Sequence, residues 1–220
     1  MEPFSPLELF DLSSYPHKAL LENCTYAWEA LLFLKKYLTQ QNLGNLQGTI
    51  SSNAYLVNKN QIFIGKGTVI EPGAYIEGPC WIGENCTIRH GAYIRGNVIT
   101  GHGCILGHDS EFKHSILLNG SQAAHFAYVG DSILGNHINL GAGTICANLK
   151  LDKQPVEVKF ESHRIHTGLR KLGAILGDNA QTGCHAVLNP GTVFGKAALC
   201  YPCLNVSGYL SPGTKMKMEK

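Results

Sequence analysis

The sequence has little charge of either sign and no long hydrophobic run. Only 15% of its 220 residues are charged and the formal net charge is +2, so a broad nucleic-acid-binding surface is not expected. The most apolar window, AWEALLFL at residues 27–34, is too short to span a bilayer. The first residues lack a basic stretch followed by an apolar one, so we expect no signal peptide, no membrane partner and a cytoplasmic location.

The eight cysteines are spread along the chain and do not have the spacing of a small disulfide-stapled fold. Cys200-x-x-Cys203 is a lone pair without a second CxxC, which disfavours a zinc or redox site. We expect no bound metal, and we interpret Cys80, Cys86 and Cys104 as small buried side chains.

Glycine is abundant, with 25 residues, and an apolar residue recurs every six positions. A small side chain commonly stands two positions earlier. The period breaks at residues 119–130 and again at 150–173. The positions that share this phase are Ile64, Ile70, Ile76, Ile82, Ile88, Ile94, Thr100, Leu106, Phe112 and Leu118, then Leu176, Thr182, Leu188, Phe194, Cys200 and Val206.

Neither a helix period of 3.6 nor strand alternation produces a period of six. Short strands joined by turns do, if three six-residue units make one triangular coil. The sequence therefore predicts an all-β parallel β-helix. We expect an arm and helix at 1–48, the β-helix at 49–210 and a tail at 211–220, with a loop insertion at 150–173 that holds a short hairpin around 156–160.

The N-terminal residues precede the repeats. The pattern predicts an irregular arm to residue 15, a helix over about 16–41 with Ser14 as a candidate N-cap, and a linker to Gly48. The helix either covers an end of the solenoid or docks a partner. We favour an end cap, because solenoid ends must be covered.

Residues 111–148 carry two specific motifs, His125-x-x-Tyr128-Val-Gly-Asp and Asn139-Leu-Gly-Ala-Gly-Thr. With NLKLDKQPV and RKLGAILGD further on, this run resembles the hexapeptide-repeat acetyltransferase domain of bifunctional glucosamine-1-phosphate N-acetyltransferase/uridyltransferases. It is closer still to the same domain of archaeal sugar-1-phosphate nucleotidyltransferases. The resemblance covers about residues 64–207 and implies a left-handed β-helix.

The resemblance implies an N-acetyltransferase that acetylates an amino-sugar phosphate from acetyl-CoA, acts in UDP-N-acetylglucosamine synthesis and forms a homotrimer. His125 matches the general base, and Ala142 and Cys184 match positions near acetyl-CoA. About sixty residues precede the repeats and contain no glycine-rich loop, so no nucleotidyl transfer is expected. The substrate-binding positions implied by the resemblance are Arg95, Lys113, Tyr128, Asn139, Asn148 and, from a neighbouring subunit, Lys171.

Two other functions remain open at this stage. The chain could be a non-catalytic module that binds a sugar phosphate or sugar nucleotide beside a separate nucleotidyltransferase. Cys184 stands where the family usually has Ser, and residues 207–220 hold no match to the family's C-terminal Arg. A γ-type carbonic anhydrase is disfavoured, because no His pair has the His-x4-His spacing. His102, His108 and His114, six apart, are interpreted as solvent-facing turn residues on successive faces.

Overall fold

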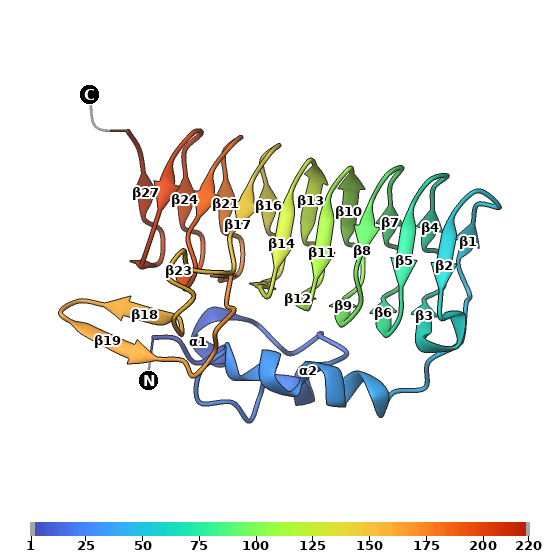
Figure 1. Cartoon of the computed structure of the whole chain (residues 1–220), viewed down its shortest axis with the longest axis horizontal. Helices are drawn as coiled ribbons and strands as arrows, with labels where there is room; N and C mark the ends of the chain where they lie inside the picture. Colours follow the sequence, from blue (N-terminus) through green and yellow to red (C-terminus); the bar gives the residue numbers. More distant parts are fainter. Residues whose placement is uncertain (1–2, 219–220) are drawn as a thin grey trace.

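The computed structural model describes residues 3–218 as a three-sided parallel β-helix with a helical segment along one side (Figure 1). Each side is one parallel sheet, and the chain visits the three sheets in turn. Sheet 1 contains β1 (Thr49–Ile50), β4 (Val69–Ile70), β7 (Thr87–Ile88), β10 (Ile105–His108), β13 (Gln122–His125), β16 (Asn139–Leu140), β21 (Gln181–Thr182), β24 (Leu199–Cys200) and β27 (Lys215–Met216). Sheet 2 contains β2 (Tyr55–Val57), β5 (Tyr75–Glu77), β8 (Tyr93–Ile94), β11 (Glu111–Lys113), β14 (Tyr128–Gly130), β17 (Ile145–Cys146), β22 (Val187–Leu188) and β25 (Asn205–Val206). Sheet 3 contains β3 (Ile62–Ile64), β6 (Cys80–Ile82), β9 (Val98–Thr100), β12 (Ser115–Leu117), β15 (Ile133–Leu134), β20 (Ala174–Leu176), β23 (Thr192–Phe194) and β26 (Tyr209–Leu210).

The six-residue phase points into the prism. All six isoleucines from Ile64 to Ile94 are at most 1% exposed, and each stacks over its equivalent in the next coil, as Ile70 does over Ile88. The small residues two positions earlier are buried with them, among them Cys86 and Cys104. The predicted fold class, an all-β left-handed parallel β-helix of hexapeptide repeats, is confirmed.

One residue is lost from the repeat at the turn around His114. Ile94 pairs with Phe112 before this turn and Ile99 pairs with Ile116 across it, so the second pairing spans a coil that is shorter by one residue. Leu118 shares the six-residue phase in the sequence and is expected to fill the prism with the others, but it does not, because a one-residue slip reverses the side chain that faces inward. Leu117 fills the prism instead, and Leu118 packs on the outside of sheet 3.

The N-terminal segment differs from the predicted end cap. It forms α1 (Pro6–Leu9), the 3-10 helix η1 (Lys18–Leu20) and α2 (Glu29–Thr39), and it runs along the side of the prism (Figure 1). Its apolar residues pack with the outward side chains of sheet 3, Ile99, Ile116 and Ile133 among them. The outer face of sheet 3 is apolar along its length. Packing the N-terminal segment on this face buries that apolar surface, whereas packing it over the end of the prism would leave the face exposed to water.

Polar contacts hold this segment on the prism. The buried carboxylate of Asp178 accepts hydrogen bonds from the backbone N–H of Asp11 at 2.6 Å and of Asn136 at 2.7 Å. The ring of His114 donates from Nε2 to the carbonyl oxygen of Leu31 at 3.0 Å. His114 is thus half-buried against α2, and its interpretation as a solvent-facing turn residue is wrong.

The insertion carries the expected hairpin, formed by β18 (Glu157–Phe160) and β19 (His163–His166) in antiparallel register. In the segment predicted as a tail, β27 pairs with β24, so the coil continues to Met216. The 3-10 helix η2 (Lys59–Gln61) lies before β3. Cys200 is buried and Cys203 exposed, so the CxxC pair does not face one site. Among residues 3–218, no helix has the length and apolar character needed to cross a membrane.

Candidate functional site

The outer face of sheet 2 brings together residues that are far apart in the sequence. Successive coils place Tyr93, Glu111 and Tyr128 opposite one another in the strand register. Two positions further along each strand, Arg95 and Lys113 occupy a second outward column, because side chains alternate between the two faces of a strand. The stacking of the coils therefore aligns three of the predicted substrate-binding residues, Arg95, Lys113 and Tyr128, on one surface.

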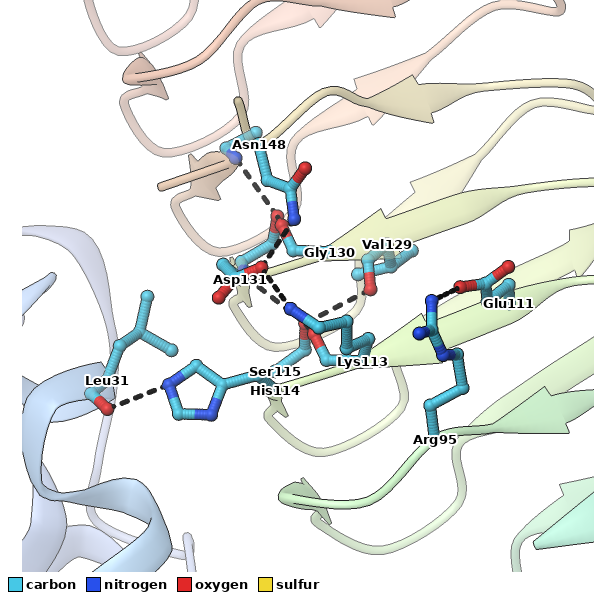
Figure 2. Close-up of polar contacts among 12 residues, drawn as sticks. Leu31, Arg95, Glu111, Lys113, His114, Ser115, Val129, Gly130, Asp131 and Asn148 are labelled. Atoms are coloured by element: carbon cyan, nitrogen blue, oxygen red, sulfur yellow. Dashed lines mark hydrogen bonds and ion pairs between the residues drawn. The ribbon is translucent and has the colours of Figure 1, made fainter. Parts of the chain in front are cut away.

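Lys113, Asp131 and Asn148 form a hydrogen-bonded cluster where sheet 2 turns toward sheet 3 (Figure 2). Lys113 Nζ lies 3.0 Å from Asp131 Oδ2, and the side-chain amide of Asn148 donates to the same oxygen. Asp131 is buried, so its charge needs these partners. The cluster fixes the ammonium group of Lys113 at the edge of the sheet.

Arg95 lies one coil away from Lys113. Its Nη1 donates to Glu111 Oε1 at 2.6 Å (Figure 2), and this hydrogen bond is the main cause that raises the pKa of Arg95. The guanidinium has five N–H donors, so one bond to Glu111 leaves others for a ligand. Its carbon also lies 5.7 Å from the centroid of the Tyr93 ring, within cation–π range.

The atoms around Gly130 explain why the Tyr-x-Gly-Asp motif has glycine at this position. A Cβ at this position would lie 2.5 Å from Tyr128 Oη and 2.8 Å from Asn148 Nδ2. The tyrosine hydroxyl and the asparagine amide thus cross over the glycine. Burial raises the pKa of Tyr128, and Glu111 and Asp131 raise it further, so the phenol remains protonated and can donate a hydrogen bond.

His125 is the last residue of β13, just before the turn from sheet 1 to sheet 2 that leads into β14. This turn stacks coil on coil: Phe126 N–H donates to His108 O, Gly143 N–H to His125 O, and His185 N–H to Ala142 O. One column of turn residues follows from this, and it contains His90, His108, His125, Ala142 and Cys184. The predicted base and both predicted acetyl-CoA positions therefore adjoin one another along one edge.

The surroundings of His125 are open. His125 is exposed, and the next residue, Phe126, is 54% exposed and has a left-handed φ of 51°. The ring of Phe126 lies 5.2 Å from that of His108. Five residues, from Phe126 to Gly130, separate His125 from Asp131 of the cluster.

Two predicted residues lie apart from this face. Asn139 is in β16, exposed on sheet 1, and pairs with Gln122 and Gln181 rather than with the strands of sheet 2. Lys171 precedes Leu172, whose N–H donates to the carbonyl oxygen of Asn148. The structure thus holds the end of the insertion beside the cluster, while within residues 3–218 the cluster is bonded through Asp131 and not through Lys171.

The sequence reasoning did not assign roles to Glu111, Gly130 or Asp131, although the last two stand in a recognised motif. It also missed the histidine column, because it compared histidines six positions apart. His90, His108 and His125 instead follow one another at intervals of one coil. The Nδ1 atoms of His90 and His108 donate to Pro72 O and His90 O. In the described part of the chain, no three His, Cys, Asp or Glu side chains are placed to hold a metal.

A family model, the GMPPB C-terminal domain, matches residues 76–199. The chain is 36% identical over 169 residues to the bifunctional sugar-1-phosphate nucleotidylyltransferase/acetyltransferase of Sulfurisphaera tokodaii, which covers 77% of this chain and 41% of that protein. It is 36% identical over 168 residues to the bifunctional protein GlmU of Methanocaldococcus jannaschii, with 76% and 40% covered. Among solved structures, the UDP-N-acetylglucosamine acyltransferase of Francisella novicida aligns with a TM-score of 0.48 and 16% identity, covering 70% of this chain and 57% of that one.

The chain spans about two fifths of the length of the two bifunctional relatives. Their names agree with the resemblance found in the motifs, which is confirmed. The family model covers more than half of the chain, including His125, Lys113 and Tyr128. The chain therefore belongs to the family of the GMPPB C-terminal domain.

Proposed function

We propose that the chain is an N-acetyltransferase that moves an acetyl group from acetyl-CoA to the amine of an amino-sugar phosphate of the glucosamine-1-phosphate type. The observation that supports this most is the alignment of Arg95, Lys113, Tyr128 and Asn148 along one face, with His125 just before the turn that leads into that face. The names of the bifunctional relatives point the same way.

The sugar phosphate lies across the face of sheet 2 in this proposal. The phosphate binds Lys113 and Arg95, because both are cations with donors directed to the outer surface. Tyr128 donates to the sugar through its protonated phenol, and Asn148 offers its amide beside it. The amine then points along β14 toward His125.

His125 accepts the proton that the amine must lose to become a nucleophile. The ring is exposed on the turn, so its nitrogen can reach a ligand on the surface. In this proposal Asn139 reaches the amine from sheet 1, across the turn. Lys171 approaches the phosphate from a neighbouring subunit.

The turn beyond His125 fits the cofactor. Ala142 stands between Gly141 and Gly143, and Cys184 follows Gly183, so small side chains form a ledge suited to the slender pantetheine arm. Bound acetyl-CoA supplies an activated thioester carbonyl there. Cys184 stands where the family usually has Ser. Cysteine is also small, but its thiol is a weaker hydrogen-bond donor than the hydroxyl of Ser.

The site is an open surface on a single chain, so a homotrimer with parallel prism axes would enclose it. Sheet 3 is covered by the chain's own N-terminal segment, which leaves sheets 1 and 2 for neighbouring copies. Light scattering at micromolar concentration should give three times the chain mass. A monomer mass would exclude both the trimer and the contribution of Lys171 from a neighbour.

Thiol release from acetyl-CoA, measured against a panel of amino-sugar phosphates, tests the reaction. Release that depends on one amino-sugar phosphate, and that is lost in His125→Ala, is the expected result. The alternative is the non-catalytic sugar-phosphate module, which the Ser-to-Cys replacement at Cys184 favours. It predicts that no thiol is released. It also predicts that calorimetry detects binding of the same sugar phosphate, with the same affinity in His125→Ala as in the parent.

A further inference from the structure

Three exposed tyrosines continue the outer column of sheet 2 beyond the candidate site. Tyr55, Tyr75 and Tyr93 are 63%, 37% and 39% exposed. Their rings follow one another at centroid distances of 6.4 and 5.3 Å, stacked in the first pair and edge-to-face in the second. An acetyl transfer to a sugar 1-phosphate uses none of these rings, because the sugar and its single phosphate end at Arg95.

The second outward column of the same sheet changes in charge along the prism. From the site outward it presents Lys113, then Arg95, then Glu77, each one coil further on. Neighbouring strands lie about 4.8 Å apart, so the two cations stand side by side in the direction of the tyrosines. Glu77 is an anion and ends the segment that attracts phosphate, which leaves room for two phosphates and no third.

We propose that this face binds a nucleoside diphosphate sugar, with the diphosphate along Lys113 and Arg95 and the nucleobase against Tyr93 and Tyr75. Aromatic side chains stack on nucleobases without requiring one particular base, since every base has a π face. This inference rests on the proposed function, because the amino sugar keeps its position between Tyr128 and His125. It changes the substrate class from a sugar 1-phosphate to a sugar nucleotide.

The contacts of Arg95 are consistent with this occupant. The guanidinium lies both against the Tyr93 ring, at 5.7 Å, and against Glu111. It therefore joins the phosphate-binding column to the aromatic column at the coil where a diphosphate would meet a nucleoside. The carboxylate of Glu77, beside Tyr75, can accept hydrogen bonds from ribose hydroxyl groups.

Calorimetry on the full-length chain tests the inference, with UDP, GDP, UMP and inorganic pyrophosphate as probes. We expect UDP or GDP to bind at least about tenfold more tightly than pyrophosphate and UMP, because pyrophosphate lacks the nucleobase and UMP lacks the second phosphate. Tyr93→Ala should weaken this binding roughly tenfold, the loss of a base–aromatic stack, whereas Tyr93→Phe should retain it. Tyr55→Ala is the matched control, since Tyr55 lies two coils from Arg95, and its affinity should equal that of the parent.

Equal affinity of Tyr93→Ala and the parent for UDP and GDP would overturn the inference. So would equal affinity of the parent for UDP, GDP and pyrophosphate. If Tyr93→Ala instead lowers the mass seen by light scattering and no nucleotide binds, the tyrosine column is a contact between copies of the chain, and the inference also fails.

The thiol-release assay on the same preparations separates this failure from that of the proposed function. Turnover of an amino-sugar 1-phosphate without nucleotide binding retains the proposed function and removes the inference. Nucleotide binding without turnover of any amino sugar supports the nucleotide site and removes the acetyl transfer.

Discussion

Replacing Gly130 with alanine should disable the candidate site while leaving the β-helix folded. The added Cβ would lie 2.5 Å from Tyr128 Oη and 2.8 Å from Asn148 Nδ2, whereas ordinary contact begins at 3.4 Å. Both neighbours are side-chain ends, and the φ of Gly130 lies outside the left-handed region, so the backbone can accept alanine. The tyrosine hydroxyl must retreat by the difference, 3.4 − 2.5 = 0.9 Å, and the asparagine amide by 3.4 − 2.8 = 0.6 Å.

A displacement of about 1 Å in a positioning group can cost about 10²-fold in rate. We therefore expect Gly130→Ala to lower kcat/KM for the amino-sugar phosphate by about 10- to 100-fold, or about 1.4–2.7 kcal/mol of transition-state stabilisation. The loss of stability should stay below about 3 kcal/mol, the usual cost of moderate overpacking. Thiol release gives the first quantity, and urea denaturation gives the second.

Tyr128→Phe provides the matched control, because it removes the hydroxyl without adding a clash. If Gly130→Ala acts by displacing that hydroxyl, the double variant should lose little more than either single variant. A parent-like kcat/KM in Gly130→Ala would refute the positioning role of Tyr128. Additive losses in the double variant would refute the common cause.

Three further predictions address the base, the prism and the N-terminal segment. His125→Ala should lower kcat in the thiol-release assay by roughly 10²–10⁴-fold with a smaller change in KM, and a fully active variant would exclude His125 as the base. Ile82→Asp places an unpaired charge inside the prism, so the variant should lose several kcal/mol of unfolding free energy and melt at a lower temperature than the parent. A melting temperature equal to that of the parent would contradict the strand register. Burial lowers the pKa of His17 to about 4, whereas the unfolded chain takes up this proton near pH 6.5, so stability should fall as pH drops from about 6.5 toward 4, by up to about 3 kcal/mol. If the urea midpoint of His17→Phe changes with pH as steeply as that of the parent, the loss of stability at low pH comes from other groups.

The site residues could be found from the sequence to the extent that the repeat positions them. Arg95 and Lys113 are one coil apart by residue count, so their alignment follows from the period. Asn148 is brought to Lys113 by Asp131, a contact that depends on a buried carboxylate needing donors. Motif matching named the cations and the amide but not the acid that holds them.

The histidines show the same limit. His108 belongs to the column of His125 because the two lie one coil apart, a relation that the six-position comparison of His102 and His114 does not reveal. The loss of one residue near His114 leaves both phases chemically plausible, since Leu117 and Leu118 are both leucines. Only the pairing of strands in space selects Leu117 for the interior.

The sequence by itself determined the β-helix, because isoleucines at a period of six can be buried together only if three short strands close a triangle. It also determined the hairpin insertion and the family of the chain. The tertiary structure alone decided where the N-terminal segment lies. An amphipathic helix specifies that it needs an apolar surface but not which one, and the outward residues of sheet 3, such as Ile116 and Ile133, become a continuous surface only after the coils have stacked.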